Sequence, residues 1–180
     1  MGWKMILTQR RQAAKTKSRI FLTLLLAAPA FAQSAPSFVN EGTINASLAA
    51  VWNVWTTGEG YKLLGVALAD VDLRVGGLIR SRYSAAGVLG DDETIENRIL
   101  AFEPQRMIAI RIERTPKSFP FKDAWKKTWT VVTLTDLGGS RTHIRIASMG
   151  YGTDAESMAM RKFFEAGNAE TIETLQKHFK

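Results

Sequence analysis

Residues 66–84, with the sequence VALADVDLRVGGLIRSRYS, decide the fold class of this chain. From Asp70 to Val75, apolar side chains alternate with charged ones, and this period of two is typical of a strand with one covered face and one exposed face. Gly76 and Gly77 then permit a tight turn or a bulge, after which Leu78–Ser84 reads as a second strand. The stretch therefore predicts two neighbouring antiparallel strands.

Patterns of the same kind recur along the chain. Turn signals separate them, at Pro104-Gln105 in one place and at Leu137–Ser140 in another, where two glycines permit positive φ. Together with the two strands above, the pattern predicts a sheet of six to seven antiparallel strands. The further predicted strands are Phe38–Ile44, Thr94–Phe102, Met107–Arg114, Trp125–Asp136 and Thr142–Met149.

Residues 115–124 interrupt this series. The segment contains Pro116 and Pro120, and proline has no N–H to donate to a sheet ladder. We therefore expect a long loop that could act as a mobile flap, and the sequence leaves open whether it gates a cavity.

A short helix is predicted after the first strand. Ser47 is a suitable N-cap, and four apolar residues recur at helical spacing, so that two tryptophans face the same way. Residues 56–58 end this helix, and residues 61–65 could add one short turn of another. The four apolar residues are Leu48, Val51, Trp52 and Trp55.

A longer helix is predicted at the C-terminus, where Thr153 and Glu156 fit a capping box. Between the bulky Phe163-Phe164 and Leu175, the side-chain volume of this helix falls, because its middle turn offers Ala166, Gly167, Ala169 and Thr171. Either a ligand fills the resulting gap, or the glycine lets the helix and sheet backbones approach closely, and both readings stay open. The stripe consists of Met160, Phe163, Phe164, Gly167, Thr171 and Leu175.

This order of elements predicts an α+β fold in which a curved antiparallel sheet grips the C-terminal helix, with an apolar cavity between them. The sequence resembles the START-related helix-grip (SRPBCC) superfamily, and within it the group of heat shock protein 90 ATPase activator homologues. The resemblance covers nearly all of residues 38–179, and DLRVGG at residues 72–77 is its most specific piece. Further matching segments are Ile44–Ser47 before Val51-Trp52, Ile99–Pro104 before Arg106-Met107, and Gly138–Thr142.

The resemblance implies one START-like domain over residues 38–180, after a lead-in at residues 33–37. It also implies a cavity that binds a small hydrophobic molecule or lipid, in which some relatives carry out cyclisation or dehydration. Two segments depart from the family pattern at places that would help to line the cavity. Tyr61–Leu64 replaces a pair of tryptophans, and Glu165–Asn168 replaces a Gly-Trp pair. The fold therefore transfers, but the identity of the ligand does not.

Residues 1–32 have the pattern of a cleavable secretory signal peptide. Six Lys and Arg residues within the first 19 positions precede the apolar run Ile20–Ala28, and Ala30-Phe31-Ala32 offers a small-x-small cleavage site. Because spanning a bilayer needs ~20 apolar residues, we expect cleavage after Ala32, a periplasmic or secreted protein, and no stable membrane insertion afterwards. An exported protein would not meet a cytosolic chaperone, so co-chaperone activity is not carried over from the resemblance.

The charge of the chain is concentrated in this segment. The 180 residues carry 24 Lys plus Arg and 17 Asp plus Glu, a net charge of +7, but residues 1–32 hold six of the bases and none of the acids. The remainder therefore has a net charge of +1, which gives no electrostatic footprint for a nucleic acid, and we expect no nucleic-acid partner. The absence of cysteine excludes a disulfide scaffold or a thiolate metal site.

Candidate ligand-binding residues follow from the alternation within the strands. Tyr83 and Asn97 alternate with apolar neighbours and are expected to point inward, where they meet either a ligand or local backbone and water. Trp52 and Trp55 serve either as core or as lining. The remaining candidates are the aliphatic Leu73, Ile79, Ile99, Ile110, Leu134 and Ile146, with Phe164 and Gly167 on the helix.

The residues do not reveal a reaction. His143 alternates to the outer face of its strand and His178 lies at the end of the chain, so neither is placed as a base beside a nucleophile. An enzyme of the cyclase, dehydratase or hydrolase type would use Tyr83, or an inward Arg82 or Arg98, as its acid. Whether any reaction is catalysed stays open.

No metal or cofactor is expected either. Asp91-Asp92-Glu93 reads as a solvated turn, because calcium loops alternate their oxygen donors around a sharp glycine turn. The two Gly-Gly pairs join strand to strand, whereas a phosphate-binding loop leads into a helix N-terminus. A third function remains open, an interaction module of the cell envelope that presents Trp125 and Trp129 on its outer face. The oligomeric state is not predicted.

Overall fold

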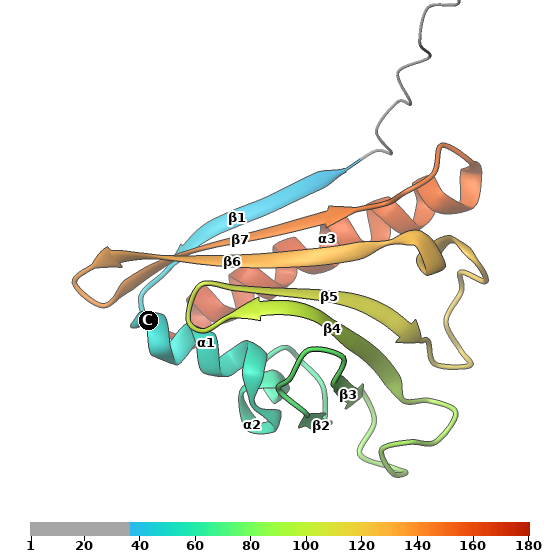
Figure 1. Ribbon diagram of the computed structural model, residues 1–180, viewed down its shortest axis with the longest axis horizontal. Coiled ribbons are helices and arrows are strands. Elements are labelled where there is room, and N and C mark those ends of the chain that lie inside the picture. The colour runs from blue at the N-terminus through green and yellow to red at the C-terminus, as the bar shows by residue number, and fades with distance from the viewer. Residues whose placement is uncertain (1–36) are drawn as a thin grey trace, which may run out of the picture. The chain divides into compact units, whose positions relative to one another are not determined.

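The computed structural model describes residues 37–180. These residues form one seven-stranded antiparallel sheet with helices packed against it (Figure 1). The strand order is β1-β7-β6-β5-β4-β3-β2, so consecutive strands from β2 to β7 pair directly, and β1 is the edge strand beside β7. The strands are β1 (Phe38–Ile44), β2 (Leu68–Val71), β3 (Leu78–Arg82), β4 (Ile95–Glu103), β5 (Met107–Arg114), β6 (Trp129–Gly138) and β7 (Arg141–Met149).

Three α-helices and one 3-10 helix accompany the sheet in the described part of the chain. Each α-helix begins at a residue whose side chain accepts a backbone N–H: Ser47 from Ala50, Thr57 from Gly60, and Asp154 from Ser157. These bonds satisfy donors that the first helical turn leaves free. The helices are α1 (Leu48–Thr56), α2 (Gly58–Lys62), the 3-10 helix η1 (Ala124–Lys127) and α3 (Ala155–His178).

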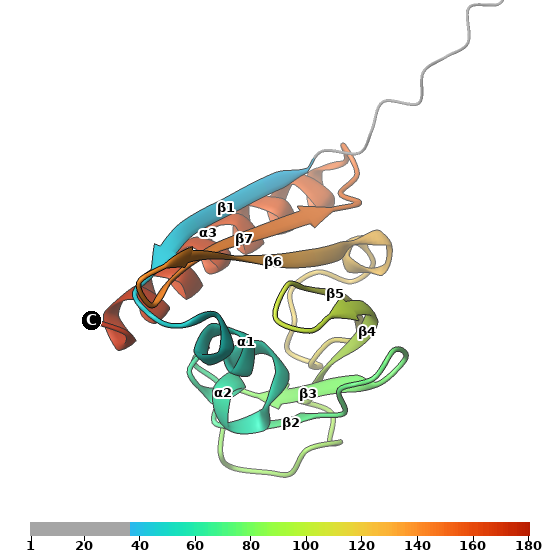
Figure 2. The ribbon, with the colours of Figure 1, turned by 60° about the vertical axis from the view of Figure 1, so that its left-hand side comes forward.

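The helices cover different parts of the sheet (Figures 1 and 2). The long helix α3 lies along β1, and Asn40 Nδ2 of that strand donates a hydrogen bond to the carbonyl of Glu165 at 3.2 Å. Helix α1 contacts β6 and β7, and α2 contacts β2. The predicted α+β fold, with a curved antiparallel sheet and a long C-terminal helix, is confirmed.

Two hydrophobic clusters lie on the side of the sheet that faces the helices. The larger one joins α1, the inner face of the strands and the C-terminal half of α3, and includes the fully buried Val51, Ile144 and Leu175. The smaller one centres on Tyr151 and Met160 and lies beneath the aromatic residues of the 115–124 loop. Burial of one large aliphatic side chain contributes ~1.5–3 kcal/mol, so the larger cluster is the main source of stability.

The first strand of the predicted pair ends earlier than its alternation indicates. Strand β2 stops at Val71, and residues 72–77 form a turn that folds back onto β4. Gly76 N donates to the carbonyl of Ile99 at 2.8 Å, and Ile99 N donates to the carbonyl of Gly77 at 2.9 Å. These two bonds continue the β3–β4 ladder, while Arg74 N donates to the carbonyl of Asp72 at 2.8 Å and Gly77 N to that of Arg74 at 2.9 Å, so that Leu73 lies in the turn.

Two helical segments also differ from the prediction. The second helix covers Gly58–Lys62 rather than residues 61–65, because Thr57 both ends α1 and caps α2. Residues 124–127 form the 3-10 helix η1 instead of the start of a strand, so β6 begins at Trp129.

The capping of α3 involves different residues from those predicted. Asp154, not Thr153, is the N-cap, and its carboxylate accepts hydrogen bonds from the backbone N–H and the hydroxyl of Ser157. The Glu156 carboxylate instead accepts the backbone N–H of Lys122 at 2.5 Å and that of Asp123 at 3.4 Å. Glu156 therefore anchors the 115–124 loop to the start of α3.

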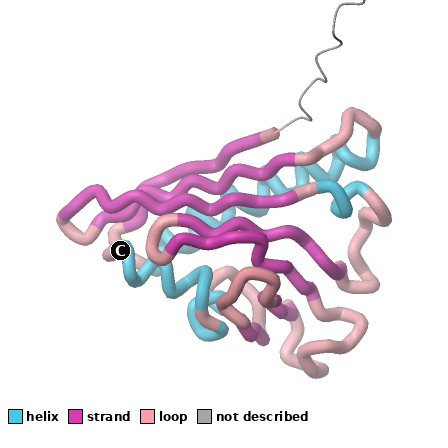
Figure 3. Tube along the Cα trace, in the orientation of Figure 1, coloured by secondary structure: helices cyan, strands magenta, loops and turns pink. Residues whose placement is uncertain are grey.

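The loops that follow β3, β5 and β7 gather at one end of the sheet (Figure 3). The 115–124 loop lies between the other two, and Lys117 N donates to the carbonyl of Asp92 at 2.9 Å while the Ser118 hydroxyl donates to Glu93 at 2.7 Å. With the bonds to Glu156, the predicted flap is tethered on both of its sides.

The predicted signal peptide, residues 1–32, and residues 33–36 of the predicted lead-in lie outside the described residues. Within residues 37–180, no helix is both long enough and apolar enough to cross a membrane.

Candidate functional site

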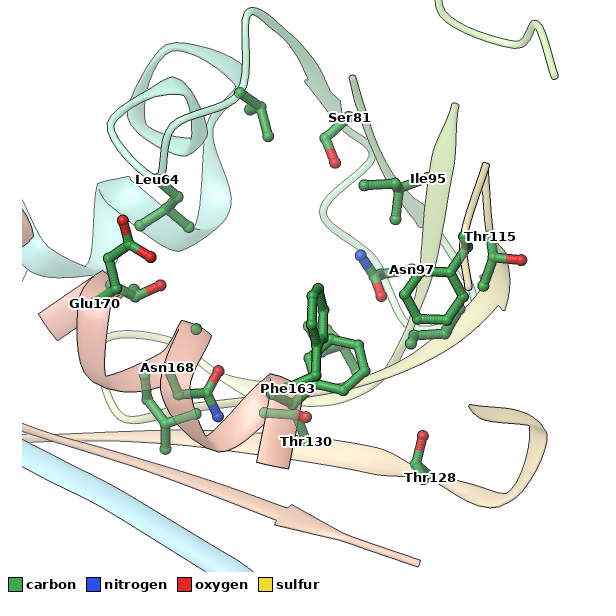
Figure 4. Close-up of a pocket in the computed structure, with 18 of the residues that line it drawn as sticks. Leu64, Ser81, Ile95, Asn97, Thr115, Thr128, Thr130, Phe163, Asn168 and Glu170 are labelled. Atoms are coloured by element: carbon green, nitrogen blue, oxygen red, sulfur yellow. The ribbon is translucent and has the colours of Figure 1, made fainter. Parts of the chain in front are cut away.

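A cavity of about 510 Å³ opens between the inner face of the sheet, the middle of α3 and the α1–α2 corner (Figure 4). A volume of this size is within the range of small-molecule sites. The lining residues are Trp55, Tyr61, Leu64, Val66, Ser81, Tyr83, Ile95, Asn97, Ile110, Ile112, Thr115, Pro116, Phe119, Thr128, Trp129, Thr130, Ile146, Tyr151, Phe163, Phe164, Ala166, Gly167, Asn168, Glu170 and Thr171.

The small residues in the middle of α3 create this space. A Cβ atom added at Gly167 would have no atom within 4 Å among its surroundings, and Gly167 and Ala166 are both exposed and line the cavity. Of the two readings that the sequence left open, the structure therefore has a gap at Gly167 and not a close approach of the helix and sheet backbones.

Seven of the twelve predicted ligand-binding residues line the cavity. Asn97 is 9% exposed and projects from β4 into the space (Figure 4). Tyr83 also lines the cavity but is 70% exposed, so it stands at the mouth rather than inside. The seven residues are Trp55, Tyr83, Asn97, Ile110, Ile146, Phe164 and Gly167.

The other five predicted residues do not line the cavity. Leu73 lies in the 72–77 turn and is 38% exposed, because β2 ends before it. The remaining four occupy the half of the sheet where α1 and the C-terminal turns of α3 close over the inner face, and they form part of the larger hydrophobic cluster. These four core residues are Trp52, Ile79, Ile99 and Leu134.

The lining also contains residues that the sequence reasoning did not select. Ser81 and Ile95 share their strand faces with Tyr83 and Asn97, so the same alternation could have found them. The two segments that depart from the family pattern both reach the cavity, through Tyr61 and Leu64 in one and residues 166–168 in the other. The aromatic residues of the 115–124 loop gave no periodic signal.

Two polar side chains on β3 and β4 face the cavity without a partner in the described residues. The Ser81 hydroxyl and the Asn97 amide make no hydrogen bond to residues 37–180, although these side chains are 2% and 9% exposed. On the opposite wall, the Ser148 hydroxyl is 3.1 Å from that of Thr130 and accepts from Asn168 Nδ2 at 3.3 Å. Ser81 and Asn97 are therefore available to a polar group of a ligand.

Two buried tyrosines, Tyr61 and Tyr151, contribute neutral phenols to the cavity wall. Burial raises the pKa of Tyr61, and the neighbouring Tyr83 raises it further. Burial also raises the pKa of Tyr151 to about 12, although a hydrogen bond with Ser148 opposes this shift. At neutral pH these phenols stay protonated, so they can donate hydrogen bonds but do not act as bases.

A buried donor lies in the wall beside Tyr61. Trp55 packs edge-on against Tyr61 with ring centroids 6.3 Å apart, and its indole N–H is buried without a hydrogen-bond partner in residues 37–180. An unpaired buried donor costs ~1–3 kcal/mol, so this wall is less stable than a fully satisfied one.

The 115–124 loop closes one side of the cavity with aromatic rings. Phe119 lies 6.2 Å from both Phe163 and Phe164 of α3, and Phe121 lies 5.7 Å from Phe163, measured between ring centroids. Edge-to-face and tilted pairs of this kind each contribute ~0.5–1.5 kcal/mol beyond their buried area. The loop is thus held to α3 by ring contacts as well as by Glu156.

The arginines considered as acids are engaged away from the cavity. Arg82 pairs with Asp91 at 3.0 Å and donates to the carbonyls of Ser84 and Ala86, and Arg98 pairs with Glu113 at 3.0 Å. Neither arginine lines the cavity, so the expectation of an inward arginine is wrong. Arg82 follows Ser81 and Arg98 follows Asn97, so each arginine lies on the opposite face of its strand from the residue that faces the cavity.

The acidic turn at Asp91-Asp92-Glu93 has a structural role. The hydrogen bond from Arg82 holds the pKa of Asp91 below its usual value, and the backbone N–H groups of Glu93 and Val88 and the Thr94 hydroxyl lower it further. Within residues 37–180, no three His, Cys, Asp or Glu side chains lie together as a metal site would require.

The two tryptophans proposed for an outer interaction surface have separate environments. Trp125 is half-buried against the smaller hydrophobic cluster and donates its indole N–H to the carbonyl of Lys122 at 3.1 Å. Trp129 is 40% exposed and contributes to the cavity rim. Only one of the two rings is therefore largely accessible.

Solved structures with the same architecture come from several bacteria. A protein from Mesorhizobium loti has a TM-score of 0.60 and 17% identity, over 79% of this chain and 95% of its own. The Aha1 dimer from Colwellia psychrerythraea has a TM-score of 0.56 and 13% identity, over 78% and 96%. A protein from Nitrosospira multiformis has a TM-score of 0.62 and 10% identity, over 81% and 97%. At these identities the likeness shows the fold.

The sequence comparisons identify the family. No curated protein matches the chain. The family model described as polyketide cyclase, dehydrase and lipid transport matches residues 35–180, which include every described helix and strand. This match and the similar structures, Aha1 among them, confirm the resemblance to the START-related helix-grip superfamily. The chain therefore belongs to the polyketide cyclase, dehydrase and lipid transport family.

Proposed function

We propose that this protein binds and carries a small, largely apolar molecule in the cavity beneath α3. The observation that carries the proposal is the open space at Gly167, where a folded domain of this family leaves about 510 Å³ unfilled. Protein interiors are close-packed, and a void of this size forgoes many packing contacts unless a ligand makes them.

The chemistry of the wall supports an amphiphilic occupant. Aliphatic and aromatic side chains provide most of the surface, and Ser81 and Asn97 offer hydrogen bonds at one side of it. A ligand with an apolar body and one polar group would bury its body against the rings and pair its polar group there.

Native mass spectrometry of the protein and solvent extraction of what it carries test this function. We expect a bound apolar species in the wild type and in the control Lys162→Leu, which adds a leucine to an exposed position of α3 outside the lining. Gly167→Leu places the same side chain in the open space and should remove the bound species. A folded wild type that arrives empty and shows no saturable binding of 1-decanol would overturn the proposal.

A second candidate is an enzyme of the cyclase or dehydratase type in the same cavity, since the family description includes both activities. Tyr83 is the candidate acid, because it stands at the mouth of the cavity and close enough to Tyr61 to raise the pKa of Tyr61. The test is turnover of a cyclisable or dehydratable substrate by the wild type and by Tyr83→Phe. Undiminished turnover in the variant would remove Tyr83 from this role.

We further propose that the domain acts outside the cytoplasm after removal of residues 1–32. The basic segment, the apolar run and Ala30-Phe31-Ala32 support this. The intact mass of the protein recovered from the cell envelope or medium tests it, with a chain starting at Gln33 expected. An uncleaved chain in the cytoplasm would contradict export and would reopen a co-chaperone role.

A further inference from the structure

A single carboxylate faces the cavity. Among the 25 lining residues in the described part of the chain, Glu170 is the only charged one, and the lining contains no Lys, Arg or His. Glu170 extends from α3 on the side where Leu64, in the turn after α2, also points into the space, across from Ser81 and Asn97 (Figure 4). The charge of the cavity wall is therefore negative and lies at one side.

This carboxylate also differs from every other acid in the protein. All 17 Asp and Glu residues lie in the described part of the chain, and 15 of them accept a hydrogen bond or pair with Lys or Arg there, while Glu41 lies 4.0 Å from the imidazole of His143. Glu170 makes neither with residues 37–180. Its neighbour on the helix, Glu173, pairs with Lys177 at 3.7 Å. Glu170 is thus free to pair with a ligand.

The aromatic residues of the lining also favour a positively charged ligand group. Eight aromatic side chains contribute to the wall, and the faces of such rings attract cations through their quadrupoles. An anionic headgroup would find a carboxylate and ring faces but no basic partner among the lining residues. The aromatic lining residues are Trp55, Tyr61, Tyr83, Phe119, Trp129, Tyr151, Phe163 and Phe164.

The position of Glu170 on α3 connects it to the open space. Phe163, Gly167 and Glu170 are spaced i, i+4 and i+7, so they lie in a row on one face of the helix. A ligand that fills the gap at Gly167 would contact Phe163 with its apolar body and bring its end to Glu170.

From these observations we propose that the cavity selects an organic cation, a molecule with an apolar body and a protonated amine or quaternary ammonium group that pairs with Glu170. This inference rests on the proposed ligand-binding function and narrows it to one class of ligand. It separates the protein from a carrier of fatty acids, whose carboxylate would face the Glu170 carboxylate.

Three ligands with the same ten-carbon chain test the inference. We would measure the dissociation constants of decylamine, 1-decanol and decanoate by calorimetry at pH 7 and low ionic strength, below micelle-forming concentrations. The wild type should bind decylamine about tenfold more tightly than decanoate, which corresponds to ~1.4 kcal/mol. Glu170→Gln should weaken decylamine binding about fivefold and leave 1-decanol binding unchanged.

Glu173→Gln is the matched control, since it removes the same charge from the same helix outside the cavity. It should change none of the three constants by more than about twofold. Equal affinities of the wild type for decylamine and decanoate, or an equal effect of the two substitutions, would overturn the choice of a cation. The proposed function would fail separately, through the absence of saturable binding of uncharged 1-decanol.

Discussion

Gly42 of β1 lies directly beneath Ile172 of α3, and a Cβ atom at Gly42 would come within 2.7 Å of Ile172 Cγ2. The C-terminal half of α3 therefore rests on the sheet at contact distance. Five residues earlier, at Gly167, the same helix faces open space. One helix thus closes the hydrophobic core with its C-terminal half and roofs the cavity with its middle.

Alanine substitutions at these two glycines should have opposite effects on stability. Gly42→Ala forces a methyl group against Ile172, and overpacking of this kind lowers the free energy of unfolding by about 1–3 kcal/mol. Gly167→Ala adds a methyl group in open space and removes a flexible residue from a helix interior, which raises the free energy of unfolding by about 0.5–1 kcal/mol. Urea unfolding followed by circular dichroism measures both. Destabilisation by Gly167→Ala would show that the gap closes in solution.

Asn97 should stabilise a polar ligand rather than the protein. Its amide makes no hydrogen bond within residues 37–180, so Asn97→Leu should leave the free energy of unfolding unchanged or raise it. Binding of 1-decanol should weaken about fivefold, as expected for the loss of ~1 kcal/mol from one hydrogen bond. Titration by tryptophan fluorescence and urea unfolding of the same variant measure the two effects. Unchanged decanol affinity would mean that the alcohol does not reach Asn97.

Most strands could be predicted because their alternation is uninterrupted. Phe38–Ile44 and Met107–Arg114 have the predicted bounds in the structure. At Leu73 the same argument was wrong, because the alternation continues through a turn that Arg74 N and Gly77 N close by donating to the carbonyls of Asp72 and Arg74, and whose end pairs with Ile99 of β4. A contact with a strand more than 20 residues away leaves no periodic trace in the local sequence.

The sequence predicts which side of the sheet a candidate residue faces, but not whether that residue reaches the cavity. Alternation correctly places Ile79 and Asn97 on the inner side, where they are direct partners in the β3–β4 ladder. Only Asn97 lines the cavity, because α1 and the end of α3 cover Ile79. In the same way, Trp55 lines the cavity and Trp52 does not, because the position of the neighbouring helix decides which of the two rings is covered.

Glu170 could not be selected from the sequence by polarity, since a charged residue on a helix ordinarily faces solvent. Its spacing of i+7 from Phe163 was the available signal. The signal gains meaning only when the structure shows that this face of α3 roofs a cavity.

The anchoring of the 115–124 loop should be visible in hydrogen exchange. Glu156 accepts the backbone N–H groups of Lys122 and Asp123, so Glu156→Ala should raise the exchange rates of these two amides about fivefold, for the loss of ~1 kcal/mol. Glu173→Ala removes the same charge from α3 without touching the loop and serves as the control. Equal rates in the wild type and both variants would show that Glu156 does not hold the loop.

The pair formed by Asp91 and Arg82 should make the stability of the domain sensitive to acid. The hydrogen bond from Arg82 lowers the pKa of Asp91 in the folded state below the value of about 4 expected in the unfolded chain. The ionised carboxylate therefore stabilises the fold above pH ~4, and this contribution is lost as the pH falls through the lower folded pKa.

Asp91→Asn should accordingly lower the melting temperature at pH 7 and reduce its dependence on pH between about 5 and 2. The decrease in melting temperature at pH 7 is larger than the loss of an exposed ion pair would give, because Arg82 is only 8% exposed and would be left without its carboxylate partner. Asp92→Asn is the control one residue away: Asp92 and Lys117 form a pair at 3.8 Å in which both side chains are exposed, so its melting curve should match that of the wild type at every pH. Melting temperatures from differential scanning fluorimetry across this pH range compare the three proteins. Parallel curves for the wild type and Asp91→Asn would contradict the assignment of the acid-sensitive step to Asp91.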